Sequence, residues 1–459
     1  MKIYTNTIDL ANPSTKKFWV APFSDFSIGV KFVVNNKPID GDVILKTKDG
    51  VELTSNGKYG DGFTIFNMKS AEANETTEYI AIAPNGQENI IVQNVSDSTV
   101  YDVNANADKT ESIDLATPFT IELGDTTSEA TIWFSGYPDP DYGLYLEYRI
   151  NDNEWTKYEV EFTPELIAPE ITIGKGDKLQ FRATDNGNIT FSGVQFNATV
   201  PVNSIDGLIF SGNIMTLLDN TGKRNDVPSS CFENWLGEGT ASTIYDAENL
   251  IFPAQTLSRA CYAGMFYDCS KLIKAPKLPA MELAEQCYRA MFGMCTSLEY
   301  PMNELPAEYL PNDCYFQMFN GCSSLKTIPV IKANEIVGGC CGMMFAGCEQ
   351  LEDLSKFKLY GDYNIESESG TPMKAYQGMF YRCINLMKSP VILLKGTIME
   401  GDSWIGSGTI HLMFAQCGSL EYLYMPFLEM STIEDDGAIE GLSQPIKVFC
   451  NEGETMVND

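Results

Sequence analysis

Hydrophobic residues recur with a fixed spacing in the second half of the chain. A Met-Phe pair appears six times, and each copy has a cysteine four residues after the methionine and a leucine seven residues after it. The methionines and cysteines are Met265, Cys269, Met291, Cys295, Met318, Cys322, Met344, Cys348, Met379, Cys383, Met413 and Cys417. Six copies of one spacing identify an internal repeat array.

The spacing within one copy predicts a short helix. Cys261, Met265, Phe266 and Cys269 stand at positions i, i+4, i+5 and i+8, which form one stripe of a helix. A short extended stretch such as residues 325–329 follows, and its proline limits the strand to a few residues. One helix and one strand cannot bury their own apolar face, so the copies must stack into a solenoid.

The first half of the chain has a different pattern. Alternating and β-branched runs such as residues 28–34, 145–150 and 178–183 are separated by turn signals such as Asn35-Asn36. These predict short strands in β-sandwiches. The fold class expected is therefore multidomain, with two N-terminal β-sandwich-like domains followed by an α/β leucine-rich-repeat solenoid. We expect the domains at residues 1–107, 108–205 and 206–459, the last with a lead-in and a C-terminal cap.

The repeats resemble the BspA-like leucine-rich repeats. The resemblance covers roughly residues 208–430 and rests on Cys-Tyr-x-x-Met-Phe-x-x-Cys-x-x-Leu at residues 261–272, followed by Lys-Leu-Pro-Ala at residues 277–280. Residues 210–218 also resemble the segment that commonly precedes such arrays. Members of the family are surface adhesins and interaction proteins of gut bacteria, or parts of phage particles that infect them. The resemblance therefore implies a binding role.

The last copies depart from the compact pattern. Successive methionines are 26, 27, 26, 35 and 34 residues apart, so the two long periods hold insertions, which include residues 360–369 and 399–407. Both insertions fall between the strand and the next predicted helix, and we expect them on the same side of adjacent repeats, where binding faces often lie. Their aromatic rings can stack on a sugar or peptide, and their carboxylates can accept hydrogen bonds. The candidate ligand-binding residues are Tyr360, Asp362, Tyr363, Asp402 and Trp404. The alternative is two solvated loops that tolerate extra length.

The charge of the chain excludes some partners. It has 31 basic and 62 acidic residues and a net charge of -31. Such a surface repels nucleic acid and anionic membranes, so we expect neither as a partner. The chain has no apolar run of the length that a membrane span needs, and its first residues do not resemble a signal peptide.

The thirteen cysteines are best explained by the repeats. Stacked copies place equivalent cysteines in a ladder of packed, reduced thiols. A zinc site is disfavoured because paired Cys-x-x-Cys motifs are missing, while disulfides between neighbouring copies remain an alternative. A calcium ion at Asp139-Pro140-Asp141 is a weaker possibility, because no full calcium-binding loop is present. We predict no metal site and no cofactor.

Catalytic signatures are missing from the sequence. The single histidine, His411, stands at a repeat position that is Ala, Arg, Phe, Gly or Gln in the other copies, which suits a surface residue. No nucleophile elbow, phosphate-binding loop or dinucleotide fingerprint occurs. A carboxylate pair for glycoside cleavage needs no histidine, so a glycoside hydrolase remains a distant alternative. We expect a protein without catalytic residues.

These patterns lead to one expected function. We expect a phage virion structural protein, a head fibre or tail-associated fibre located on the virion. Its N-terminal domain would contact other virion proteins, and its repeats would bind a host-surface glycan or protein. By analogy with other fibres, we expect a homo-oligomer. The alternative is a bacterial cell-surface adhesin of the same repeat family, located outside the cell and expressed without its leader.

Overall fold

The structure is a computed structural model of the 459-residue chain. It describes most of residues 117–457, with gaps at 139–142, 163–164, 237–238, 334, 364–374, 396–409, 429, 436, 443 and 451–452. Within residues 1–116 it describes the strands and residues 51–54. The chain divides into two compact units, Met1–Asp114 and Leu115–Asp459.

The first unit contains two antiparallel sheets. One sheet has the order β1-β2-β8-β5, and the other has the order β10-β9-β3-β7-β6, with β4 paired to β3. The strands are β1 (Ile3–Tyr4), β2 (Thr15–Val20), β3 (Phe26–Val34), β4 (Lys37–Pro38), β5 (Ile44–Thr47), β6 (Ser55–Tyr59), β7 (Phe63–Met68), β8 (Thr77–Ile82), β9 (Asn89–Asn94) and β10 (Val100–Asp102). Alternating apolar residues put Leu45 and Phe66 in the core of this unit.

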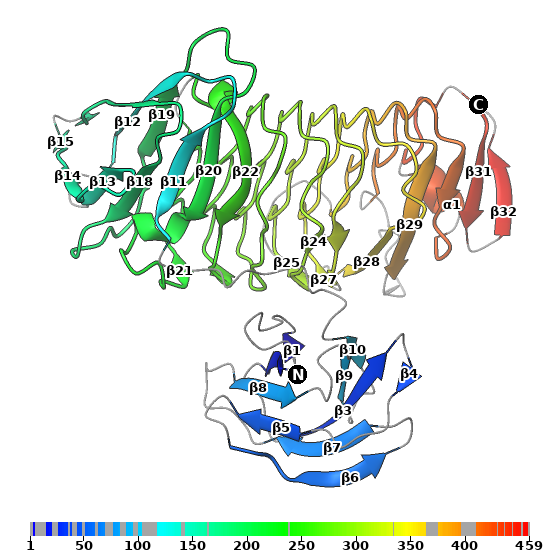
Figure 1. Ribbon diagram of the computed structural model, residues 1–459. Helices are drawn as coiled ribbons and strands as arrows, with labels where there is room; N and C mark the ends of the chain where they lie inside the picture. Colours follow the sequence, from blue (N-terminus) through cyan, green and yellow to red (C-terminus); the bar gives the residue numbers. More distant parts are fainter. Residues whose placement is uncertain are drawn as a thin grey trace. The chain divides into compact units, whose positions relative to one another are not determined.

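The second unit begins with two sheets and a short two-stranded hairpin (Figure 1). A six-stranded sheet has the order β14-β13-β18-β11-β20-β22, a three-stranded sheet has the order β17-β12-β19, and β15 pairs with β16. The strands are β11 (Phe119–Leu123), β12 (Glu129–Gly136), β13 (Leu146–Ile150), β14 (Thr156–Tyr158), β15 (Glu161–Phe162), β16 (Leu166–Ile167), β17 (Ile171–Gly174), β18 (Leu179–Ala183), β19 (Val194–Thr199), β20 (Leu208–Asn213) and β22 (Ile244–Ile251). Because β20 and β22 belong to the six-stranded sheet, the repeat array continues directly from it. The boundary expected at residue 205 lies between β19 and β20.

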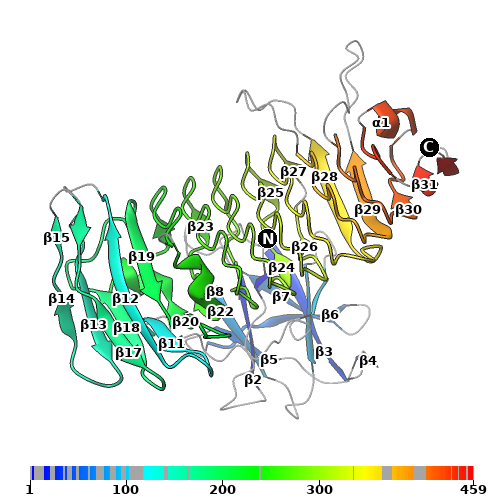
Figure 2. The same ribbon diagram turned by 90° about the horizontal axis from the view of Figure 1, so that it is seen from above.

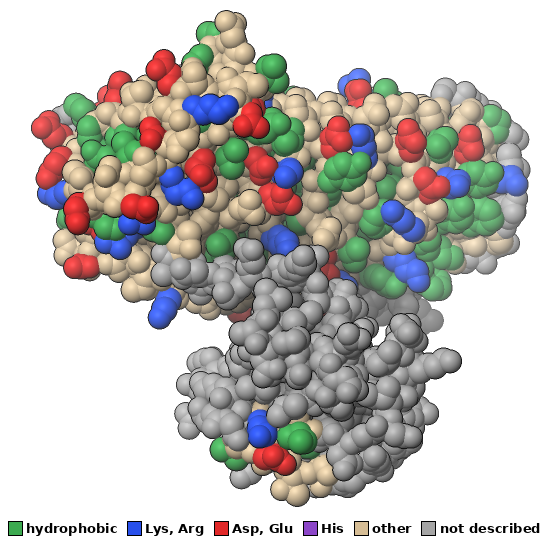
Figure 3. All heavy atoms as spheres, in the orientation of Figure 1, with side chains coloured by type: hydrophobic (Ala, Val, Ile, Leu, Met, Phe, Trp, Pro, Cys, Tyr) green, Lys and Arg blue, Asp and Glu red, His purple; other side chains and the backbone are tan. Residues whose placement is uncertain are grey.

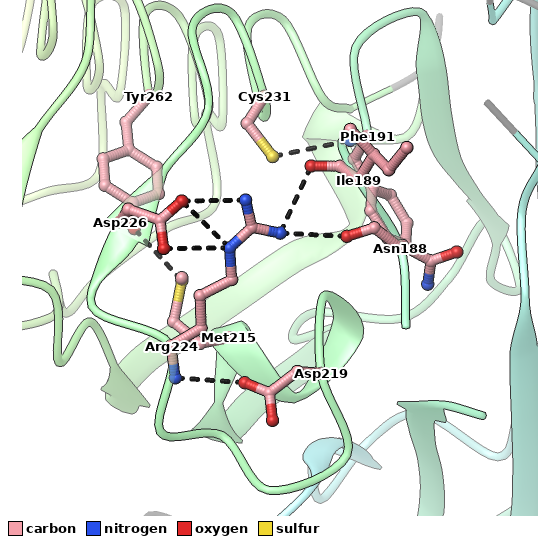
Figure 4. A network of polar contacts seen from close by, with 9 residues as sticks. All are labelled: Asn188, Ile189, Phe191, Met215, Asp219, Arg224, Asp226, Cys231 and Tyr262. Atoms are coloured by element: carbon pink, nitrogen blue, oxygen red, sulfur yellow. Dashed lines mark hydrogen bonds and ion pairs between the residues drawn. The ribbon is translucent and has the colours of Figure 1, made fainter. Parts of the chain in front are cut away.

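The junction between these sheets and the array is tied by side chains (Figure 4). The guanidinium of Arg224 donates hydrogen bonds to the carbonyl oxygens of Asn188 and Ile189, at 3.0 and 3.3 Å. It also donates to Asp226 at 2.8 Å, and this bond lowers the pKa of the Asp226 carboxyl. Asp226 begins β21 (Asp226–Val227), the first short strand of the array, which pairs with β23 (Thr256–Leu257). Arg224 therefore adds charged hydrogen bonds to a junction that the pairing of β20 with β22 also joins.

The repeats stack as parallel coils, but they contain no helix of the predicted kind (Figures 1 and 2). We number the coils 1 to 6 by their methionines, from Met265 to Met413. Among the residues that the structure describes, the one α-helix is α1 (Met430–Asp435), and the short 3₁₀ helices are η2 (Ile214–Leu217) and η3 (Ala241–Thr243). The predicted α/β solenoid is therefore wrong. The expectation of a β-rich chain with more than one domain holds in part.

Overlapping β-turns take the place of each predicted helix. In coil 1 the N–H of Met265 donates to the carbonyl of Tyr262 three residues back, at 3.3 Å. The N–H of the next residue, Phe266, donates instead to Met291 of the following coil, at 2.9 Å. This alternation continues from Cys261 to Cys269, so every second amide binds the neighbouring coil. We call this part of each coil the turn ladder.

Backbone conformation explains why the pattern does not form a helix. Every fourth residue of the turn ladder has a positive φ, as at Ala260 (52°), Gly264 (60°) and Asp268 (61°). A left-handed residue ends a right-handed helix, and each non-glycine one costs about 1–2 kcal/mol. The hydrogen bonds to the next coil offset this cost, because a helix leaves no amide for its neighbours. The apolar stripe thus repeats every four residues. Over a stretch of only nine residues, this period is too close to the 3.6-residue period of an α-helix to be told apart from it.

Identical side chains stack along the inside of the turn ladder. The phenylalanines of successive coils are stacked with ring centroids 5.2–5.6 Å apart: Phe266, Phe292, Phe319, Phe345, Phe380 and Phe414. The ladder methionines and cysteines are also fully buried. A further coil precedes the six, because Phe232 and Asn234 donate backbone hydrogen bonds to Cys261 and Ala263. There, Trp235 takes the place of the methionine.

The strand side of the coils changes along the array. In coils 1–3 the named strands have two residues each: β24 (Glu304–Leu305), β25 (Tyr309–Leu310), β26 (Val330–Ile331) and β27 (Glu335–Ile336). After Met344 they lengthen to β28 (Lys358–Tyr363), β29 (Lys388–Lys395), β30 (Tyr422–Tyr424), β31 (Ile446–Cys450) and β32 (Gly453–Val457). These five strands join β25 and β27 in one seven-stranded sheet that is parallel up to β31. Part of the extra sequence in the long coils therefore widens a sheet.

Candidate ligand-binding face

The predicted binding residues fall partly on this wide sheet. Tyr360 is in β28 and its side chain is 43% exposed. Asp362 and Tyr363 are the last residues of the same strand, where the structure describes their backbone. Asp402 and Trp404 lie outside the described residues. The first insertion thus begins inside a strand, and its residues 364–369 are outside the described part.

The strands of the two long coils finish side by side, at the same end of the sheet. Asp362 of β28 is the register partner of Lys395, the last residue of β29. Asp362 also pairs with Glu335 of β27 on its other side. The described chain therefore leaves β28 and β29 at neighbouring positions, because the two strands run parallel.

Alternation along β28 to β31 creates a continuous outer face. Leu359, Ile392, Leu423 and Val448 are buried, so the residues between them face outward. We call these residues the sheet face: Lys358, Tyr360, Lys388, Val391, Leu393, Tyr422, Tyr424, Lys447 and Phe449. Figure 3 shows hydrophobic side chains gathered over this end of the array.

The strand register arranges the sheet face in rows. Lys388, Tyr422 and Lys447 are successive register partners and form one row. Val391 pairs with Tyr424, which pairs with Phe449, and the rings of the last two are stacked 5.0 Å apart. Lys358 is the register partner of Val391 on its other side, so the second row consists of Lys358, Val391, Tyr424 and Phe449.

A bulge in β29 aligns these rows. The register shifts between Lys388 and Val391, where Ser389 and Pro390 are buried. The Ser389 hydroxyl accepts a hydrogen bond from the backbone N–H of Tyr424 at 2.9 Å and donates one to the Pro390 carbonyl at 2.8 Å. The bulge adds one residue to β29, so both Lys388 and Val391 point outward.

The sheet face differs in charge from the rest of the chain. Strands β28 to β31 contain four lysines, Lys358, Lys388, Lys395 and Lys447, and one acidic residue, Asp362. The whole chain has twice as many acidic as basic residues, 62 against 31. Strands β28 to β31 therefore contain more lysines than acidic residues, unlike the chain as a whole.

One ion pair borders the first row. Lys388 Nζ lies 2.8 Å from the carboxylate of Asp353 and 6.0 Å from the centre of the Tyr422 ring. Its hydrogen bond holds the pKa of the Asp353 carboxyl at about 2, and the same bond raises the pKa of Lys388. Lys388 thus stays protonated at physiological pH.

The cysteine thiols of the turn ladder make hydrogen bonds that the sequence did not suggest. In five successive coils the thiol donates to the phenylalanine carbonyl of the preceding coil, at 3.1–3.2 Å, from Cys295, Cys322, Cys348, Cys383 and Cys417. All thirteen cysteines are free and buried. Burial raises the pKa of Cys287 and Cys417 to about 12, so these thiols remain protonated.

Other candidate sites are less developed. His411 lines an open hollow of about 430 Å³ together with Glu434, Asp435 and Glu440. A second hollow of about 330 Å³ lies beside Met387. Within the described part of the chain, no three His, Cys, Asp or Glu side chains are placed to hold a metal ion. The calcium candidate at Asp139–Asp141 lies outside the described residues.

Comparison of the chain with protein-family models, curated proteins and solved structures found no match. The described residues include no helix with the length and hydrophobicity that a membrane span requires. The candidate site therefore rests on its own geometry. The sequence holds two kinds of signal for its residues. The insertions pointed to Tyr360. The period-two alternation in Tyr422-Leu423-Tyr424 and Lys447-Val448-Phe449 is a second signal, and the predicted binding residues do not include these segments.

Proposed function

We propose that this chain is a phage virion structural protein, a head fibre or tail-associated fibre, that binds host or mucosal ligands through the sheet face. The observation that carries the proposal is the sheet face itself. It combines outward tyrosines, lysines and apolar residues on the widest sheet of the array. Its backing is a fully buried ladder of phenylalanine, methionine and cysteine side chains, which keeps the displayed residues in fixed positions.

The thiols favour a virion over an exported adhesin. Thirteen cysteines pack as free thiols, and five of them donate hydrogen bonds that a disulfide would remove. A chain that folds in an oxidising compartment exposes such thiols to disulfide formation before the ladder is complete. A virion protein folds in the reducing cytoplasm and leaves the cell inside a finished particle. The resemblance to BspA-like repeats and the attachment of residues 1–107 to other virion proteins remain predictions.

An adsorption assay tests the binding part of the proposal. The full chain and its Tyr360→Ala/Tyr424→Ala variant are incubated with mucin-coated beads and with host cells. We expect at least a tenfold loss of adsorption to one of these surfaces. The matched control is Tyr300→Ala, because Tyr300 is a 58% exposed tyrosine on the strand side of coil 2. Equal adsorption of all three proteins would contradict the assignment of the sheet face as the binding site.

Labelling of particles tests the location. An antibody against the array is expected to mark purified phage particles in immunogold electron microscopy. Labelling of the bacterial surface in cells without phage would instead support the adhesin alternative.

A further inference from the structure

We propose that Tyr376, a buried tyrosine of the turn ladder, is a positioning residue for ligand binding at the sheet face, because its hydroxyl holds the backbone of Tyr360. This inference rests on the proposed function and adds to it a residue that does not itself touch the ligand. It follows from three features, namely the open side of β28, the hydrogen bond made there, and a break in the stack of buried tyrosines.

The first part of β28 is paired with a strand on one side only. β28 pairs with β29 along residues 358–362, but it pairs with β27 only at residues 362–363. The N–H of Val391 in β29 donates to the carbonyl of Phe357 at 2.9 Å. Backbone carbonyls alternate in direction along a strand, so the carbonyl of Tyr360, three residues further on, points away from β29. It faces the side that β27 does not reach.

The hydroxyl of Tyr376 binds this carbonyl. Tyr376 stands three residues before Met379 in the turn ladder of coil 5, and its side chain is fully buried. Its hydroxyl donates a hydrogen bond to the Tyr360 carbonyl at 2.8 Å. Burial raises the pKa of Tyr376 well above its usual value, so the hydroxyl keeps the proton that it donates. The bond therefore joins the buried scaffold to the backbone of an exposed residue of the sheet face.

A break in a stack of tyrosines sets Tyr376 apart from its equivalents. In coils 1–3 the same position holds Tyr262, Tyr288 and Tyr315, whose rings are stacked 5.9 and 6.0 Å apart. In coil 4 the position is Cys341, a much smaller side chain that lies close enough to Tyr376 to influence its pKa. Tyr376 thus has a small neighbour on the side of coil 4, the coil to which β28 belongs.

Loss of this hydrogen bond affects binding through Tyr360. Its carbonyl would lack a donor, and a buried acceptor without a partner is unfavourable, so the first part of β28 would shift toward water. The side chain of Tyr360 would then occupy a wider range of positions before a ligand binds. Ordering such a side chain opposes binding, which lowers affinity although no contact with the ligand has been removed.

Two tyrosine-to-phenylalanine variants of the full chain test the inference. Tyr376→Phe keeps the ring and removes the hydrogen bond. Tyr288→Phe is the matched control, because within the described part of the chain the buried Tyr288 hydroxyl has no hydrogen-bond partner. We expect Tyr376→Phe to reduce adsorption to mucin-coated beads or host cells at least fivefold and to raise hydrogen exchange at residues 357–363 at least tenfold. Tyr288→Phe should change both measurements less than twofold.

A double variant separates positioning of Tyr360 from general loosening of the fold. When Tyr360→Ala is already present, adding Tyr376→Phe should reduce adsorption less than twofold further, because the side chain that Tyr376 positions is gone. An equal fivefold loss in that background, or faster exchange with unchanged adsorption for Tyr376→Phe alone, overturns the inference. If Tyr360→Ala reduces adsorption and Tyr376→Phe does not, the inference fails while the proposed function stands. If Tyr360→Ala/Tyr424→Ala also adsorbs normally, the binding role of the sheet face fails with it.

Discussion

Coils 1–3 and coils 4–6 share one side and differ on the other. Both sets have the same turn ladder, with stacked phenylalanines and left-handed residues at intervals of four. On the strand side, the early coils have two-residue strands, and the later coils form the wide sheet. The turn ladder is thus a constant scaffold on which the strand side varies. Repeat proteins commonly vary the face that contacts ligands in this way.

The largest expected difference between the two sets appears at high pH. Burial raises the pKa of five thiols and three tyrosines in coils 1–3, and of four thiols and one tyrosine in coils 4–6. The early groups are Cys261, Cys287, Cys295, Cys314, Cys322, Tyr262, Tyr288 and Tyr315, and the later ones are Cys341, Cys348, Cys383, Cys417 and Tyr376. A raised thiol pKa stabilises the fold fully below the unfolded pKa. This contribution is lost as pH rises toward the folded pKa, by about 1.4 kcal/mol for each thiol and pH unit.

We therefore expect coils 1–3 to open first between about pH 9, the ordinary thiol value, and pH 12. Hydrogen exchange with peptide-resolved mass spectrometry, referenced to the intrinsic rate at each pH, measures this. Loss of protection at residues 386–424 before residues 260–330 would contradict the expected order.

The next effect concerns the shared ladder. Phe319→Ala in coil 3 removes a ring stacked 5.5 Å from each neighbour, and Phe380→Ala does the same in coil 5, at 5.5 and 5.2 Å. Each variant is expected to lose about 3–5 kcal/mol of unfolding free energy, measured by urea denaturation. Phe427→Ala is the control, because Phe427 is 53% exposed. A small loss for Phe380→Ala would show that the later coils do not share the scaffold.

A smaller effect tests the left-handed positions. Ala290 has φ 50°, so Ala290→Gly relieves strain and should raise stability by about 1 kcal/mol. Ala284, in the same coil, is not among the residues with positive φ. Ala284→Gly is expected to lower stability by up to about 1 kcal/mol. Thermal denaturation of both variants decides the point, and a loss in both would argue against the turn ladder.

The smallest effect is expected at the exposed ion pairs. Lys388→Gln should return the pKa of Asp353 from about 2 toward its ordinary value, as an NMR titration of the carboxyl would show. A lowered carboxyl pKa stabilises the fold above the unfolded value and loses this effect as pH falls toward 2. Because both side chains are more than a third exposed, solvent screens the pair and the change in stability at neutral pH should be small. In the early coils, Lys326 forms an equivalent ion pair with Glu299 at 2.7 Å, so Lys326→Gln should change stability by a similar amount. A clearly larger loss of stability for one of the two variants would show that the two sets of coils differ in this respect.

The sequence predicted the repeats but not their backbone. Positions i, i+4, i+5 and i+8 suit a helix and a turn ladder equally. The residues that distinguish them are the left-handed ones, and in coil 1 these are Ala260, Gly264 and Asp268, only one of which is glycine. The pairing of amides with the next coil depends on atoms 25 residues away, as between Tyr262 and Cys287, and no local pattern encodes it.

The candidate site was predicted in part for a similar reason. Tyr360 stood out because it begins an insertion. Tyr424 and Phe449 meet through the register of parallel strands, at positions 25 residues apart. The bulge at Ser389 shifts the register between β29 and β30 by one residue, which brings Val391 beside Tyr424. Residue spacing along the chain does not reveal such a shift.

Hydroxyl-radical footprinting tests the division between scaffold and binding face most directly. The full chain is labelled in solution and again while adsorbed to mucin-coated beads, and oxidation is measured at single tyrosines. We predict protection of Tyr360, Tyr422 and Tyr424 on the sheet face, with no change at Tyr267, Tyr300 and Tyr309 of the early coils. Protection of those three early tyrosines, with unchanged oxidation of the sheet face, would contradict the account.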